Sequence, residues 1–373
     1  MAARADEILD GIRTWVEIES FSSDAAAVNR MMDRAEADWR GTGLDVARIP
    51  GRDGFGDHLM MTEPGADPNA KGVLVLCHLD TVHPIGTLAG DLPFRVDGDE
   101  AFGPGIYDMK GGAYLAFQAY REIAANGDAP RLPLRFLYTA DEEVGSNTSV
   151  DLIEREGRRA AYVLVTEPAR DGGQVVSARK GVGRYVIRAE GRPAHSGSRH
   201  GEGRSAIVEM AHQIQRIEGA TDYDRGVTFN IGQINGGTAE NVVPQHCEAT
   251  IDMRIATVAD GKHFDAWLRS LEAATPDVTV TVTGELNRPP YEKTEAGARL
   301  LGHARQLAAE IGFTLQDTYT GGASDGNFVA DDVATLDGLG VDGEGAHTLE
   351  ERCYISSFEP RKELLKRLMQ TLQ

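Results

Sequence analysis

Short apolar runs alternate with amphipathic stretches through the first half of the chain. Residues 72–77, 134–139 and 161–166 are nearly continuous apolar runs, the pattern of strands buried on both faces of a sheet. Residues 111–125 have helical spacing and lie between the first two runs. Because strands alternate with helices, we predict an α/β fold with a central, mostly parallel sheet.

The pattern changes near residue 174, after which most apolar runs alternate with polar positions. There we expect strands at residues 184–189, 228–234, 247–255 and 278–282, and helices at 206–217 and 263–274. Two βαβ-like units of this kind predict a small α+β module of the ferredoxin-like type. Helical spacing returns at 296–312 and near the C-terminus. We therefore predict one domain from residues 1–176 and 288–373, and an inserted domain at 177–287.

Composition narrows the classes of partner and compartment. The chain has 58 Asp and Glu against 38 Lys and Arg, a net charge of −20, so we expect neither nucleic acid nor membrane as a partner. Cysteines 77, 247 and 353 are odd in number and widely spaced, which predicts no disulfide framework and a reducing, cytoplasmic compartment. The N-terminal pattern of Ile8, Ile12, Trp15 and Val16 predicts an amphipathic helix and not a signal peptide.

Each of the three apolar runs leads directly into histidine or carboxylate side chains. His78 and Asp80 follow the first run, the acidic residues 141–143 follow the second, and Glu167 follows the third. In open α/β sheets, ligands bind beyond the carboxyl ends of the strands. Asp108 and His347 stand in two glycine-rich segments elsewhere in the chain. We therefore expect a polar site at one end of the sheet.

The residue types at this end suit a metal centre. Histidine and carboxylate ligands without thiolates suit zinc or a similar cation. The two oxygens of Asp108 could bridge two cations, and neighbouring Glu142 and Glu143 project in different directions, so that one could bind metal while the other reaches a metal-bound water. Asp80, two residues beyond His78 on the same face, would fix the tautomer of that histidine.

The residues alone leave simpler interpretations open. His78 and Asp80 also fit an ordinary loop pair, Asp108 a helix N-cap, and residues 141–143 a solvated acidic turn. We expect His83, His200 and His246 in loops or at the surface, Arg179 and Lys180 as solvated charges near a domain hinge, and Cys77 in the core.

Several motifs, in order along the chain, carry a family resemblance. They are HLDTVHP, GPGIYDMKGG, DEEVG, TEP, AHSG, NVVP, DMR and a C-terminal AHT. From about residue 73 to 358 the chain resembles the M20 family of zinc peptidases and amidohydrolases, nearest its glutamate carboxypeptidase branch. The family also includes aminoacylases and succinyl-diaminopimelate desuccinylases. The resemblance implies a zinc-exopeptidase-like catalytic domain, with the inserted domain as a lid and dimerisation domain of a homodimer.

The resemblance also implies roles for individual residues. Asp108 would bridge two Zn²⁺ ions, for which Co²⁺ or Mn²⁺ could substitute. The ligands of one ion would be completed by His78 and Glu167, and those of the other by Glu143 and His347. Glu142 would be the general base, taking a proton from the bridging water, and Asp80 would orient His78. In the lid, His195 would help to hold the oxyanion in the partner subunit's site, and the substrate would be bound by Arg254, Asn241 and the loop at Gly322.

The function implied is hydrolysis of the amide bond next to a C-terminal amino acid, with glutamate one option, in a small peptide or N-acyl amino acid. Attack would come from a metal-bridging hydroxide. An N-acyl-amino-acid deacylase or a dipeptidase with the same machinery is the alternative. A different class of function, a metal-free binding protein, is a further alternative. Such a protein is expected to have lost metal ligands or the general base, and this chain has lost neither.

Overall fold

The computed structural model describes residues 4–65, 67, 70–127 and 129–373, and these form two compact units. The first unit holds the residues up to Ala178 together with Lys293–Tyr319 and Ser324–Gln373. The inserted unit holds Arg179–Glu292 and the short segment Thr320–Ala323. That segment joins the inserted unit because its backbone carbonyls accept hydrogen bonds from Lys180 and Arg179.

A six-stranded sheet forms the centre of the first unit, in the order β1-β2-β6-β3-β7-β14. Its strands are β1 (Asp45–Ile49), β2 (His58–Thr62), β3 (Gly72–His78), β6 (Leu134–Thr139), β7 (Ala160–Val165) and β14 (Ala334–Leu336). β6, β3, β7 and β14 run parallel to one another, and β1 and β2 form an antiparallel edge. The predicted α/β fold with a mostly parallel sheet is confirmed.

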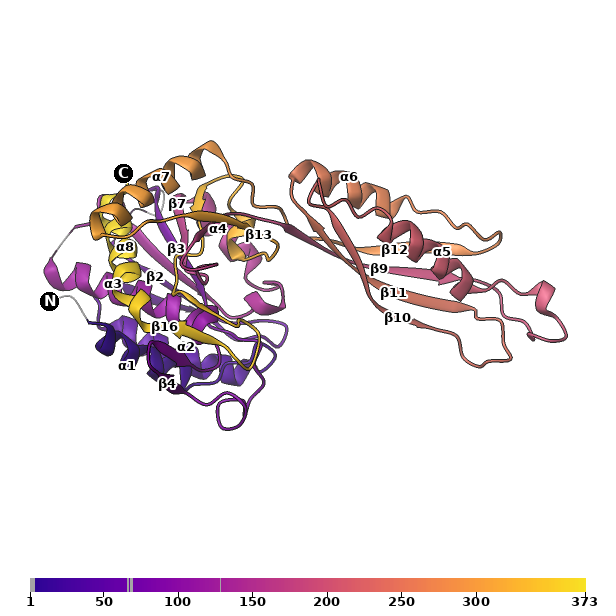
Figure 1. Ribbon diagram of the computed structural model, residues 1–373, viewed down its shortest axis with the longest axis horizontal. Coiled ribbons are helices and arrows are strands. Elements are labelled where there is room, and N and C mark those ends of the chain that lie inside the picture. The colour runs from indigo at the N-terminus through magenta and orange to yellow at the C-terminus, as the bar shows by residue number, and fades with distance from the viewer. Residues whose placement is uncertain (1–3, 66, 68–69, 128) are drawn as a thin grey trace. The chain divides into compact units, whose positions relative to one another are not determined.

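Helices cover both faces of this sheet (Figure 1). One face packs on α1 (Ala5–Val16), α2 (Ala25–Arg40), α3 (Gly111–Asn126), α7 (Glu295–Ile311) and α8 (Phe358–Thr371). The other face packs on α4 (Val150–Arg158). Because both faces are covered, β3 and β6 are buried along their whole length, as their continuous apolar runs predict.

Short strands outside the main sheet hold the loops at its carboxyl end. β4 (Arg95–Asp97), β5 (Glu100–Phe102), β15 (Gly343–Glu344) and β16 (Arg352–Tyr354) form an antiparallel sheet in the order β15-β16-β5-β4. β8 (Val175–Arg179) pairs with β13 (Asp317–Thr320). None of these strands is predicted from the sequence, because segments this short carry no hydrophobic period.

The inserted unit is a four-stranded sheet with two helices on one face (Figure 1). In chain order its elements are β9 (Gly181–Glu190), α5 (Ala206–Glu218), β10 (Thr228–Gly236), β11 (His246–Ile255), α6 (Val258–Arg269) and β12 (Thr279–Arg288). The spatial order β10-β11-β9-β12, antiparallel throughout, is the ferredoxin-like arrangement. The prediction of α6 at 263–274 was wrong in its bounds, because the Thr257 side chain caps the helix earlier, accepting a hydrogen bond from the backbone of Asp260.

Two further features of the structure concern the cysteines and the length and apolar character of the helices. Cys77, Cys247 and Cys353 are buried and form no disulfide, and Cys77 is a core residue as predicted. Among the residues described, we find no helix with both the length and the apolar character that crossing a bilayer demands.

Candidate metal centre

Five predicted ligand residues meet at the carboxyl end of the main sheet. His78 is the last residue of β3, and the segments after β6 and β7 bring Glu143 and Glu167 to the same edge. Asp108 lies in the tight turn that leads into α3, and its peptide bond to Met109 is cis. His347 stands in the loop between β15 and β16 with a positive φ of 64°. Three of these segments end or directly follow parallel strands of the main sheet, whereas the His347 loop joins the antiparallel strands β15 and β16.

The two oxygens of Asp108 face different partners. His78 Nε2 lies 3.3 Å from Asp108 Oδ1 and 3.6 Å from Glu167 Oε1. His347 Nε2 lies 3.5 Å from Asp108 Oδ2 and 3.0 Å from Glu143 Oε2. Asp108 therefore stands between two groups, each with one imidazole and one glutamate.

The donor set fits a pair of divalent cations. A zinc ion holds its nitrogen and oxygen ligands at about 2.0–2.1 Å, so neighbours in a tetrahedral shell lie roughly 3.3 Å apart. The distances between ligand atoms here are 3.0–3.6 Å. Glu143 Oε1 is also buried with no hydrogen-bond donor, which is costly for a carboxylate oxygen unless a cation satisfies it.

The electrostatics of the cluster also favour added positive charge. Burial, followed by the nearby negative charges of Asp108 and Glu142, raises the pKa of Glu143 to about 8 against the opposing contact with His347. Contacts with Asp108 and then Glu143 raise the pKa of His347 to about 11. Burial opposes ionisation of Asp108, yet His347 and His78 hold its pKa well below the usual range. A cation would remove the repulsion between these acids.

Asp80 supports both His78 and the turn that follows β6. His78 Nδ1 lies 3.0 Å from the backbone oxygen of Asp80 and 3.4 Å from its Oδ1, which leaves Nε2 free as a ligand. The Asp80 carboxylate also accepts hydrogen bonds from Ser22 Oγ at 2.7 Å and from the backbone N–H groups of Glu142 and Glu143 at 3.2 Å. One buried carboxylate thus orients three of the site's segments.

The acidic run 141–143 divides into three different environments. Glu142 is buried beside the cluster, with a carboxylate oxygen within 4.8 Å of ligand atoms of His78 and Glu167. Glu143 faces His347, as described above. Asp141 turns away and accepts hydrogen bonds from the backbone N–H and the hydroxyl of Thr148. The run is therefore not a solvated turn.

His83 lies in a loop, as predicted, but it is buried, and its Nε2 lies 2.6 Å from Oε2 of the buried Glu351, to which no sequence pattern pointed. The prediction of Arg179 as a solvated charge was wrong. Arg179 is buried and not solvated, because its side chain donates to the backbone oxygen of Gly322. His200 and His246 are exposed, as expected.

In the inserted unit, His195 lies in an exposed loop with a defined ring orientation. Its Nδ1 accepts hydrogen bonds from the backbone N–H groups of Gly197 at 3.1 Å and Ser198 at 3.2 Å. The Asn241 backbone oxygen accepts a hydrogen bond from Ser196 at 3.0 Å, which fastens the same loop. The AHSG and NVVP motifs are therefore neighbours within this unit.

Arg254 already has a partner in the inserted unit. Its Nε and terminal nitrogen donate to the two oxygens of Asp252 at 2.7 and 3.0 Å. Gly322 is exposed in the segment that joins this unit. Burial, and then the charge of Arg254, lower the pKa of Lys180, so these cations lie near each other.

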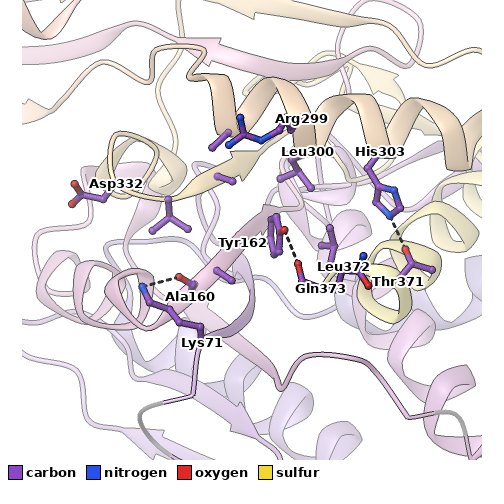
Figure 2. Close-up of a pocket in the computed structure, with 14 residues that line it drawn as sticks. Lys71, Ala160, Tyr162, Arg299, Leu300, His303, Asp332, Thr371, Leu372 and Gln373 are labelled. Carbon is purple, nitrogen blue, oxygen red and sulfur yellow. Dashed lines mark hydrogen bonds between the residues drawn. The ribbon is translucent and has the colours of Figure 1, made fainter.

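A cavity of about 680 Å³ lies at the opposite edge of the first unit, where β3 and β7 begin. Figure 2 shows that three of its polar side chains have hydrogen-bond partners, His303 with Thr371, Tyr162 with the Gln373 backbone, and Lys71 with the Ala160 backbone. It contains none of the ligand residues, so the chemistry belongs to the cluster at the other edge.

Comparison with known proteins agrees with this geometry. Residues 74–371 match Peptidase family M20/M25/M40. The chain is 30% identical over 375 residues to carboxypeptidase G2 of Pseudomonas sp. (strain RS-16), covering 98% of this chain and 89% of the relative. It is 26% identical over 334 residues to succinyl-diaminopimelate desuccinylase of Delftia acidovorans, covering 83% of each.

Solved structures share the fold. Aminopeptidase PepT from Bacillus cereus superposes with a TM-score of 0.81 at 21% identity, covering 98% of each chain. The M20 family metallo-carboxypeptidase Sso-CP2 from Sulfolobus solfataricus gives 0.74 at 14% identity, covering 98% of this chain and 99% of that one. The matched range includes every segment that supplies the ligand cluster, and the predicted resemblance is confirmed. This chain is a hydrolytic enzyme and belongs to Peptidase family M20/M25/M40.

Proposed function

We propose that this chain is a di-zinc hydrolase that cleaves the amide bond next to a C-terminal amino acid of a small peptide or N-acyl amino acid. The observation that carries the proposal is Asp108, whose two oxygens face two different histidines, each paired with a glutamate. Glutamate is the first C-terminal residue to test, because the motifs resemble the glutamate carboxypeptidase branch and the 30% identical relative is named as a carboxypeptidase.

Two cations would be held on either side of Asp108. His78 and Glu167 would complete one set of ligands, and Glu143 and His347 the other. Bound there, the cations would lower the pKa of a water molecule and polarise the substrate carbonyl. Co²⁺ or Mn²⁺ would be accepted in place of Zn²⁺, because the ligands are imidazole and carboxylate.

Glu142 would move the proton. Its carboxylate is buried within 4.8 Å of ligand atoms of His78 and Glu167, and the two ligand sets proposed above do not include it. A carboxylate held there can take a proton from the attacking water and pass it to the departing amine. Asp80 would keep Glu142 in place through the hydrogen bond from the Glu142 backbone.

His195 would donate a hydrogen bond to the developing oxyanion. Because Nδ1 accepts two backbone hydrogen bonds, the proton of the neutral imidazole is on Nε2. An Nε2–H donor of fixed direction suits a charge that appears only in the transition state. Arg254, Asn241 and Gly322 would bind the substrate, and a substrate carboxylate would share or replace the Asp252 partner of Arg254.

We also propose a homodimer formed through the inserted unit, which would act as lid and dimerisation domain. That unit carries apolar side chains that are each at least 40% exposed, namely Ile207, Val208, Tyr223 and Ile234. Its strand β10 lies at the edge of the sheet, where a second copy could add a strand beyond Phe229 and Ile231, whose backbone N–H groups already donate to Thr221 and Glu218. A cytoplasmic location remains part of the proposal, supported by three buried cysteines without disulfides.

A panel of substrates tests the proposed function. We expect the zinc-loaded chain to hydrolyse N-acylated peptides and amino acids that end in a free carboxylate. Blocking that carboxylate as an amide should lower kcat/KM by at least about 100-fold, because a site built to pair with it is left unpaired. Equal rates on free and amidated substrates would contradict the carboxypeptidase assignment.

The same substrate panel distinguishes a carboxypeptidase from the second candidate function, an N-acyl-amino-acid deacylase or dipeptidase. The 26% identity to a desuccinylase favours this second candidate. A preference for N-acetyl and N-succinyl amino acids over longer N-acylated peptides would identify a deacylase. Preference for substrates with a free amino terminus would identify a dipeptidase.

Mixing two inactive variants tests whether subunits share a site. We expect His195→Ala to lower kcat by about 100-fold or more, the typical cost of losing one oxyanion donor. Mixed with Glu142→Gln under conditions of subunit exchange, it should regain part of the parent rate, because one mixed site would contain both native residues. Absence of recovery, with exchange verified by mass spectrometry of tagged copies, would rule out the shared arrangement.

A further inference from the structure

Glu351 lies beneath the turn that carries Asp108. Its side chain is 1% exposed. Oε1 accepts hydrogen bonds from the backbone N–H groups of Tyr107 and Asp108, both at 2.9 Å, and Oε2 accepts one from Gly105 at 3.0 Å. One carboxylate thus collects three backbone donors of a single turn, and one of them belongs to Asp108 itself.

The pairing of two short strands brings Glu351 to this position. Glu351 immediately precedes β16, which pairs with β5 in the register Arg352 opposite Phe102. The turn that begins at Gly103 therefore starts opposite Glu351. Gly105 adopts φ 73°, and a Cβ there would lie 2.5 Å from Thr81 Cγ2, so this close turn requires glycine.

Glu351 also connects the segments of the two ligand histidines. Its Oε2 accepts a hydrogen bond at 2.6 Å from Nε2 of His83, which lies on the segment that continues from His78. Glu351 itself stands four residues beyond His347, on the same loop. Hydrogen bonds to an ionised carboxylate are stronger than those between neutral groups, so the three segments are held firmly together.

We propose that Glu351 is a positioning residue that sets the direction of the Asp108 carboxylate and thereby the affinity for both cations. The proposal rests on the proposed two-metal function. Without this acceptor, three buried N–H groups would lack a partner and the turn would rearrange to satisfy them. A rearranged turn would no longer offer one Asp108 oxygen to each histidine–glutamate group.

Glu351→Gln tests the proposal, with Glu350→Gln as its matched control. Glutamine keeps the size of the side chain but replaces one accepting oxygen with a donating nitrogen. Glu350 is the exposed neighbour of Glu351. We expect Glu351→Gln to bind Zn²⁺ 10- to 100-fold more weakly, the usual cost of removing an outer-shell partner of a metal ligand. Glu350→Gln should match the parent.

A second readout distinguishes positioning from a general structural role. With Co²⁺ in place of Zn²⁺, the visible absorption spectrum of Glu351→Gln should change in intensity and position, because ligand geometry changes, while that of Glu350→Gln superimposes on the parent. After metal saturation, kcat should fall about tenfold or more, with KM within about threefold. Parent-like Zn²⁺ affinity and Co²⁺ spectrum, even with a lower Tm, would overturn the proposal.

A second variant keeps the test decisive if Glu351→Gln does not fold. His83→Ala removes only the imidazole contact to Oε2 and leaves the three backbone hydrogen bonds. It should weaken Zn²⁺ binding in the same direction by roughly three- to tenfold. Parent-like binding by this variant would overturn the proposal, whereas a parent chain that binds no Zn²⁺ would overturn the proposed function instead.

Discussion

Glu142→Gln is expected to lower kcat by about 10²–10⁴-fold, the contribution of a positioned acid–base group, while the protein still binds two zinc ions. An amide cannot take the proton of the attacking water, but it fits the same buried space. The measurements are steady-state kinetics on the preferred substrate and zinc content by mass spectrometry. Zinc is retained because Glu142 belongs to neither proposed ligand set.

An exposed glutamate of the same unit provides the control. Glu295 begins α7 with its side chain in solvent, so Glu295→Gln should keep the parent rate and zinc content. If Glu142→Gln kept more than about 5% of the parent rate, the loss of rate would be smaller than the loss expected from removing a general base. The assignment of Glu142 would then be wrong.

Asp108→Asn is expected to lower zinc content from two ions per chain to one or none and kcat by at least about 1,000-fold. The amide keeps the shape of the side chain but lacks the charge and the second oxygen ligand that the two sets share. Zinc titration by calorimetry and kinetics at saturating zinc are the measurements. The loss should exceed that of any other single ligand replacement, because Asp108 lies next to both ligand histidines, with one oxygen toward each.

Asp331→Ala is the control for this change, since Asp331 is an exposed aspartate of the same unit. It should bind two zinc ions and turn over at the parent rate. Two tightly bound zinc ions in folded Asp108→Asn would contradict the bridging role of Asp108, on which the proposed two-metal site depends.

Three central strands of the main sheet, and the polar residues that follow them, could be predicted because they obey strong local rules, whereas β1, β2 and β14 were not predicted. β3 and β6 are buried on both faces, so their sequences are continuous apolar runs with polar residues directly after them. Parallel neighbours bring those polar residues to one edge. His78, Glu143 and Glu167 could therefore be grouped before their distances were known.

The positions of Glu351 and His83 could not be predicted, because they depend on pairing between short strands. β5 and β16 have three residues each, too few for a hydrophobic period, and their pairing joins segments that are distant in the sequence. The sequence correctly places His83 in a loop, but it does not show that the Glu351 carboxylate is brought to this histidine.

Arg254 illustrates an ambiguity that sequence leaves open. An arginine two residues beyond an aspartate on a strand can bind a ligand carboxylate or its own neighbour, because both geometries are available to a guanidinium. In this structure it pairs with Asp252 through two hydrogen bonds. Its role toward a substrate remains a prediction for the substrate panel.

The proposed bridging of two cations by Asp108 is tested most directly by anomalous X-ray diffraction at the zinc absorption edge. Crystals grown with excess zinc should show two strong anomalous peaks, one between Asp108, His78 and Glu167 and one between Asp108, Glu143 and His347. A map without anomalous density on either side of Asp108, in crystals where zinc is present in the solution, would contradict the account.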